Sequence, residues 1–399
     1  MPIPDREINI LFALEKFFFI HSLAASRSFT NEQSPGNMLR ITSRRIPALG
    51  SLRFTAVPTI TTRLLSKSTI SFATAGRLNI PLGDKTIEHN IPTETNKLSK
   101  TLTKFWEKVD TVHNPTTHKY DIKLDGKNLR TPLGYSLSIP ETKKQLAYLI
   151  NHEWSNLPDL KIKTNSLPLT SLASRAIDLE HISEMGMETG SKKEEMIAKV
   201  GNADDIKVNM LRYLDTDTCL IFGTYKEYSG KLRKRQEELY RPLIEEYNDF
   251  FTTYARNKGG LLASEDEKIE LTYLDCETDG LRGNKQTITT QEVVLDWLDN
   301  LPMFDLIALE KAILTTKSFL CGVSLLRSNS SNPEIMKELY QFNKKGMDDY
   351  YHKTIEEIVE LGNLETIFQT EEWGEVEDTH DVDKVDWLRN LASAALICH

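Results

Sequence analysis

The chain has 399 residues, of which 27% are charged and 39% hydrophobic, a balance typical of a globular protein with two or three domains. Its four cysteines are scattered and form no CxxC pair, which excludes a zinc ribbon or a thioredoxin motif and fits a reducing compartment. No uncharged apolar stretch reaches the ~18 residues that a transmembrane helix needs.

The first hundred or so residues lack the pattern of a folded domain. Residues 33–83 contain no acid and are rich in serine and threonine, which is typical of a mitochondrial presequence that a negative-inside membrane potential draws inward. We assign residues 38–83 as the presequence, with a basic arm for nucleic acid as the alternative. Its bases are Arg40, Arg44, Arg45, Arg53, Arg63, Lys67 and Arg77.

Residues 1–37 do not fit a presequence, because they carry four acids. We interpret them as a mispredicted extension before a true start at Met38. A secretory signal is the competing interpretation, but its leader is acidic. With both segments set aside, residues 84–399 carry a net charge of about −15, which argues against nucleic-acid binding.

A small β-rich domain is predicted at residues 104–165, after a flexible lead-in at 84–103. Tyr120, Ile122 and Leu124 alternate with polar residues, as in a half-buried strand, and turn residues follow them. A further short strand is expected at 135–139. A helix should follow Pro140, because the next apolar residues recur at helical spacing.

The remaining chain, residues 166–399, predicts a larger, mainly helical domain, so the expected fold class is α+β. One strand is expected at 269–275 and a mobile insertion at 183–204. Pro242 should kink the longest helix or start its second half. The expected helices span residues 167–182, 225–254, 290–300, 304–327 and 333–361.

The common catalytic motifs are absent. No Walker A loop, GxGxxG, GxSxG or HExxH pattern occurs in the sequence. Asp215 and Asp217 offer two carboxylates to a hard cation, but such pairs more often cap helices or lie in water.

An acidic cluster at residues 371–383 is the strongest candidate for chemistry. If the segment is helical, Glu377, His380 and Asp381 share one face, at i, i+3 and i+4. Such a face suits a metal ion or acid/base work. A contact surface around Trp373 and a solvated acidic face are the other readings.

Five stretches, in this order, resemble one family. They are the strands at 104–140, "HEW" at 152–154, "LPLTSLASRAID" at 167–178, "YLDTDT" at 213–218 and "FQTEEWGEVEDTHDVD" at 368–383. Together they resemble the mitochondrial assembly chaperones for the alpha subunit of F1-ATPase, over roughly residues 103–392. That resemblance implies a small β-rich domain joined to a larger helical one. It also implies a chaperone that is not an enzyme.

The resemblance also implies where the client binds. Glu365 matches the acidic residue upstream of the family's tryptophan and is the first choice for a client contact. Asp178 matches too, and we expect it to cap a helix or to pair with Arg175. The other candidate contacts are Gln369, Trp373, Glu377, Asp378, His380 and Asp381.

The expected function is an ATP-independent chaperone in the mitochondrial matrix that binds unassembled alpha subunit and promotes F1 assembly. The alternative is a matrix metal-dependent hydrolase that uses Glu377, His380 and Asp381. No cofactor, metal, nucleic acid or stable membrane insertion is expected. The oligomeric state is open, with a monomer favoured.

Overall fold

The computed structural model describes residues 104, 106–158, 166–185, 190–264, 266–280, 282–331, 353–377 and 379–399. All of them belong to one compact unit. The extension, the presequence and the lead-in, predicted at 1–37, 38–83 and 84–103, lie outside the described residues. The domain division at residue 165 stays a prediction. None of the helices placed here combines the length and apolar content that a bilayer crossing requires.

A small antiparallel sheet comes first and confirms the strand predicted around residues 120–124. The strand expected at 135–139 begins only at Ser138, and the strand at Val109–Asn114 was not predicted. Strand β2 (Lys119–Leu124) is its centre and pairs with β1 (Val109–Asn114), β3 (Lys127–Asn128) and β4 (Ser138–Pro140). The alternation predicted for β2 holds in part: Ile122 and Leu124 are buried and Tyr120 is half-buried, but Asp121 is buried too. This sheet packs against α3 (Lys144–Ser155), which follows the short 3-10 helix η1 (Glu141–Lys143).

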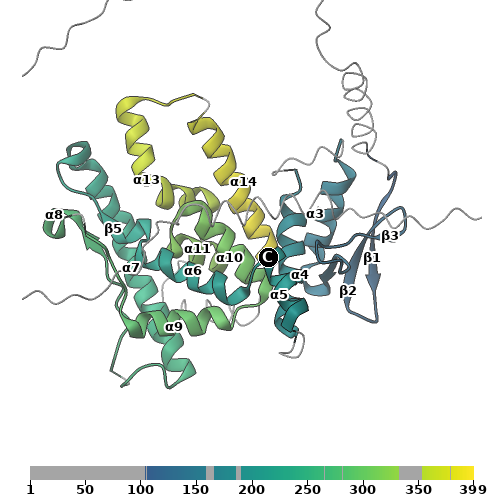
Figure 1. Cartoon of the computed structure of the whole chain (residues 1–399). Coiled ribbons are helices and arrows are strands. Elements are labelled where there is room, and N and C mark those ends of the chain that lie inside the picture. Colours follow the sequence, from purple (N-terminus) through teal and green to yellow (C-terminus); the bar gives the residue numbers. More distant parts are fainter. Residues whose placement is uncertain are drawn as a thin grey trace, which may run out of the picture. The chain divides into compact units, whose positions relative to one another are not determined.

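The rest of the unit is mainly helical, which confirms the α+β class (Figure 1). Helix α10 (Met303–Thr316) lies at its centre and packs against α4 (Pro168–Glu184), α11 (Phe319–Asn329) and α14 (His380–Cys398). Two short strands, β5 and β6, pair in parallel. The elements are α4 (Pro168–Glu184), α5 (Gly190–Val200), α6 (Ala203–Asp215), η3 (Thr218–Leu220), β5 (Ile221–Phe222), η4 (Glu227–Gly230), α7 (Lys231–Lys258), β6 (Leu274–Asp275), α8 (Cys276–Asp279), α9 (Ile288–Asp299), α10 (Met303–Thr316), α11 (Phe319–Asn329), α13 (Ile355–Trp373) and α14 (His380–Cys398).

The start of α4 is held by the helix before it. Leu167 precedes α4 and offers no capping side chain. The carboxylate of Glu153, on α3, accepts hydrogen bonds from the N–H groups of Leu169 (2.8 Å) and Thr170 (2.9 Å). Beside it, the buried Trp154 donates its indole N–H to Thr170 Oγ1 (3.0 Å). Side chains of the "HEW" stretch therefore hydrogen-bond to the start of α4, which the "LPLT" stretch forms.

Lys143 joins the beginning of the unit to its last helix. This buried ammonium donates to the carbonyl of Cys398, at the end of α14, over 2.9 Å. It also lies 3.6 Å from the carboxylate of Asp305 on α10.

Two predicted elements are interrupted. The helix expected over 304–327 is two helices, because Lys317 is left-handed (φ 56°) and Ser318 caps α11 through the N–H of Cys321. The helix expected at 333–361 lies outside the described residues up to 352. Its end belongs to a separate helix, since Thr354 and Glu357 form a capping box at the start of α13.

The strand predicted at 269–275 is mostly extended chain without a partner strand. Side chains take the place of the ladder: Thr252 Oγ1 accepts the N–H of Ile269, and Asn248 Oδ1 accepts the N–H of Leu271. Only Leu274–Asp275 pairs, with β5.

Three smaller expectations also fail. The insertion at 183–204 contains the helix α5, which buries Met196 and Val200, and 186–189 lie outside the described residues. The helix predicted to begin at 225 begins at Lys231 and runs without a break through Pro242.

Asp178 neither caps a helix nor pairs with Arg175, which instead binds Glu310. Asp178 is fully buried and accepts the N–H of Leu133 (3.3 Å), in the turn before β4. Its other oxygen has no hydrogen-bond partner among the described residues. Burial raises the pKa of this carboxyl to about 7.

We predict that Gly322→Ala destabilises the protein. A Cβ at this position of α11 would lie 2.5 Å from Cγ1 of Ile313 on α10. The overlap should lower the free energy of unfolding by about 1–3 kcal/mol, although alanine favours helices. Urea unfolding compares this variant with Gly190→Ala. A Cβ at position 190 has no neighbouring heavy atom within 4 Å, so that variant should be as stable as wild type or more stable. Equal stability of the two variants would contradict the packing argument.

We predict that Asp178→Asn changes how stability depends on pH. The folded-state pKa is raised, so the carboxyl is bound as the neutral acid at low pH, and its stabilisation is lost as pH rises towards about 7. The amide stays neutral throughout. Relative to wild type, the variant should therefore gain roughly 2–4 kcal/mol of unfolding free energy between pH 4 and pH 8. A difference between the two proteins that does not vary with pH would show that Asp178 does not titrate in this range.

Candidate functional site

The described candidate residues lie where α13 and α14 leave the helical core. We define the arm as residues 365–377 and 379–388, the distal half of α13, the turn and the first half of α14. Before the arm, α13 buries Ile358, Leu361 and Leu364; within the arm no residue is fully buried. In Figure 1 both distal halves extend beyond α10 and α11.

A break in α13 marks the base of the arm. Asn363 departs from helical geometry, with φ −116° and ψ 15°. Beside it, the phenol of the buried Tyr240 on α7 donates to the carbonyl of Leu361 over 2.9 Å. A Cβ at Gly362 would lie 3.0 Å from the ring of Trp387 on α14, so the two helices meet closely here. Beyond this point the described residues of the arm are half-buried or exposed on both helices.

Three candidates share the distal half of α13. Glu365, Gln369 and Trp373 recur every four residues and so lie along one side of the helix. The amide of Gln369 donates to Glu365 Oε1 over 3.1 Å. Trp373, the last residue of α13, is 72% exposed. Its ring lies 5.8 Å from that of Tyr228, between centroids.

The shared helical face predicted for Glu377, His380 and Asp381 is wrong. Glu377 lies in the turn before α14, which begins at His380. The imidazole Nδ1 of His380 accepts the N–H of Val376 over 2.8 Å and so closes the turn. Asp381 is exposed in the first turn of α14, where a negative charge suits the helix dipole. Asp378 lies outside the described residues.

The arm combines acids with exposed apolar side chains. Val376, Val382 and Val385 are each more than half exposed. Around them the exposed acids form no ion pair with any described base; they are Glu365, Glu371, Glu372, Glu375, Glu377, Asp381 and Asp383. Such a surface suits a protein partner, with an apolar centre and a charged edge. The sequence analysis did not single out these valines. Their position among acidic residues is the feature that could have indicated an exposed apolar surface.

No metal site is formed in the described part of the chain, where no group of three His, Cys, Asp or Glu side chains has the arrangement to hold an ion. Asp217 caps η3, as the capping interpretation expects, and Asp215 accepts the N–H of Gln286 over 2.9 Å. Asp217 is buried and accepts the N–H groups of Cys219 and Leu320, each over 2.8 Å. Burial raises the pKa of Asp217 to about 6.

Known sequences point to one family. A family model described as ATP12 chaperone protein matches residues 103–248, so the arm lies beyond the match. Protein ATP12, mitochondrial, of Saccharomyces cerevisiae is 45% identical over 318 residues, which are 79% of this chain and 90% of that protein. Protein atp12, mitochondrial, of Schizosaccharomyces pombe is 33% identical over 276 residues, 69% of this chain and 76% of that one.

Solved structures agree on the fold. The crystal structure of Atp12 from Paracoccus denitrificans has a TM-score of 0.50 at 18% identity, covering 75% of this chain and 98% of that one. A point mutant of the P. denitrificans protein gives a TM-score of 0.51 at 20% identity with the same coverage.

We predict that the arm contributes little to stability. Val385→Ser should change the free energy of unfolding by less than about 0.5 kcal/mol, because the side chain is 61% exposed. Leu391→Ser, six residues further along α14, removes a fully buried side chain and should cost about 3 kcal/mol or more. Thermal unfolding compares the two. If Val385→Ser is as damaging as Leu391→Ser, this side of α14 belongs to the core.

Proposed function

The chain belongs to the ATP12 chaperone family, and from that premise we propose that it binds the unassembled alpha subunit of F1-ATPase. Family membership gives the coarser function: a mitochondrial chaperone for the assembly of ATP synthase, and not an enzyme. The alpha subunit as client, the matrix as location and independence from ATP are our proposal.

The exposed arm is the observation that carries this proposal. An alpha subunit must bury large faces against its neighbours, and such a face aggregates when it is free. The valines and Trp373 of the arm offer apolar area to cover such a face. Because the apolar area is small and dispersed, a permanent subunit with a larger interface displaces the chaperone by mass action.

The acids of the arm supply specificity. Unpaired exposed charges at an interface edge steer the partner and disfavour wrong ones more than they add affinity. Glu365 occupies the part of the arm nearest the core, next to the break at Asn363. We therefore propose Glu365 as a client contact, with Gln369, Trp373, Glu377, Asp378, His380 and Asp381 as further candidates.

Release without ATP follows from the same argument. The sequence holds no Walker A loop, and exchange of partners by mass action requires no nucleotide. The acid-free segment at 38–83 supports import into the matrix. The alternative of a metal-dependent hydrolase is not favoured, because the family is one of chaperones and the residues proposed for it do not share a helical face.

We predict that Glu365→Lys weakens capture of the client. Immobilised wild-type protein should retain alpha subunit, without beta subunit, from a mitochondrial matrix extract. Reversing one charge at the interface edge should weaken the complex by roughly tenfold or more, about 1.4 kcal/mol or more. Quantitative capture at a series of bait concentrations measures the change.

The matched control is Glu245→Lys, the same charge reversal at an exposed site on α7, far from the arm in sequence. It should retain the alpha subunit like wild type. Equal retention by both variants removes Glu365 from the contact. Failure of the wild-type protein itself to retain alpha subunit overturns the proposed client.

A further inference from the structure

Trp373 is packed by a residue from a distant segment. Tyr228, in the 3-10 turn η4 before α7, has its ring 5.8 Å from that of Trp373 and 6.1 Å from that of Phe368, between centroids. Both partners belong to the distal half of α13, where no residue is fully buried. Tyr228, which lies outside the arm, therefore packs against two aromatic side chains of the distal half of α13.

Tyr228 sits on an unusual backbone. Tyr228 (φ 49°, ψ 34°) and Ser229 (φ 55°, ψ 31°) are both left-handed, and Gly230 (φ 78°) follows them. Only glycine adopts this conformation freely, so two consecutive side-chain-bearing residues in it are strained. Such a turn persists only where the surrounding structure holds it, and it fixes the direction in which Tyr228 points.

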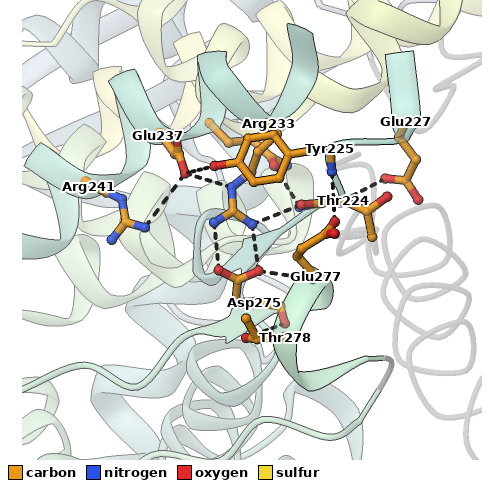
Figure 2. A network of polar contacts seen from close by, with 11 residues as sticks. Thr224, Tyr225, Glu227, Arg233, Glu237, Arg241, Asp275, Glu277 and Thr278 are labelled. Carbon is orange, nitrogen blue, oxygen red and sulfur yellow. Dashed lines mark hydrogen bonds and ion pairs between the residues drawn. The ribbon is translucent and has the colours of Figure 1, made fainter. Parts of the chain in front are cut away.

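A buried arginine that follows this turn binds the segment that precedes it (Figure 2). Arg233, in the first turn of α7, binds both carboxylate oxygens of Asp275, over 2.7 and 2.6 Å. It also donates to Glu237 (2.9 Å) and to the carbonyl of Gly223 (3.0 Å), where the segment leading to Tyr228 begins. Its side chain is only 3% exposed, so the charge is held by these partners. The ion pair lowers the pKa of Asp275 and raises that of Arg233.

The same network fixes the segment between Gly223 and Tyr228. Glu277, on α8, accepts the N–H of Tyr225 over 3.1 Å, and the phenol of Tyr225 donates to Glu237 over 3.0 Å. The Tyr225 ring also covers the Arg233 guanidinium, 5.1 Å away. In Figure 2 the labelled groups of α7, α8 and β6 surround this segment from several sides. The turn is thus bonded before and after Tyr228.

We propose that Tyr228 is a positioning residue of the client-binding arm, held by the Arg233 network so that it orders Trp373 and the distal half of α13. This inference rests on the proposed function, because it assumes that the arm binds the client. It adds a residue more than a hundred positions from the arm to the determinants of binding. Tyr228 acts through Trp373 and need not touch the client.

The first measurement concerns the chaperone alone. Tyr228→Ala should raise the rate of amide hydrogen exchange across 365–373 by about tenfold. Tyr228→Phe keeps the ring and should behave like wild type. Ser229→Gly relieves backbone strain and should also keep the slow exchange. Unchanged exchange in Tyr228→Ala overturns the inference, whatever the client is.

The second measurement is a double-mutant cycle on affinity for purified alpha subunit, using Tyr228→Ala and Trp373→Ala. Each change should weaken binding about fivefold or more, and the double variant should be no weaker than Trp373→Ala. Independent effects that multiply would overturn positioning through Trp373, as would full affinity in Tyr228→Ala. If the wild-type protein does not bind alpha subunit, the proposed function fails, and the exchange experiment still decides whether Tyr228 orders the arm.

Discussion

Buried and half-buried carboxylates hold the backbone N–H groups of distant segments, and the arrangement of the helices depends on these bonds. Glu153 binds the start of α4, Asp217 the start of α11, and Asp178 the turn before β4. Each bond joins two elements, so it fixes their relative placement as well as satisfying a donor. Losing one partner leaves a buried polar group unsatisfied, which costs more than the bond itself contributes. The stretches that resemble the family contain these three acids, and their shared role explains why no catalytic use has to be found for them.

Periodicity predicted the elements whose partners lie close in the chain. Strand β2 and helices α3 and α4 follow from spacing alone, because one face of each is buried against a neighbour. The apolar pattern over 304–327 concealed the break at Lys317, since residues on nearly every side of α10 and α11 are buried. Ser318 is the residue that could have indicated this break, because serine is a common helix N-cap. The extended chain at 269–275 was unpredictable for another reason: at Ile269 and Leu271 its hydrogen-bond partners are side chains of α7, not a second strand.

The arm shows the same limit at the site itself. The sequence located its acids and Trp373, but residue spacing could not predict where α14 begins. Because α14 begins at His380, Glu377 lies outside the helix and shares no helical face with His380 and Asp381. Nor could it connect Tyr228 to Trp373. That contact depends on three left-handed residues in succession, of which only Gly230 is of a type that suggests one.

The bond from Lys143 to the carbonyl of Cys398 spans 255 positions and joins the first helical turn of the unit to its last helix. Helix α10 packs against α4, α11 and α14, so α14 covers part of the apolar surface of α10. Closing a loop of this length costs conformational entropy, which the contacts of the docked helix must offset. A chain in which α14 is detached would therefore expose apolar side chains of its own centre. The last helix thus covers the core of this protein, as we propose that the arm covers a face of the client.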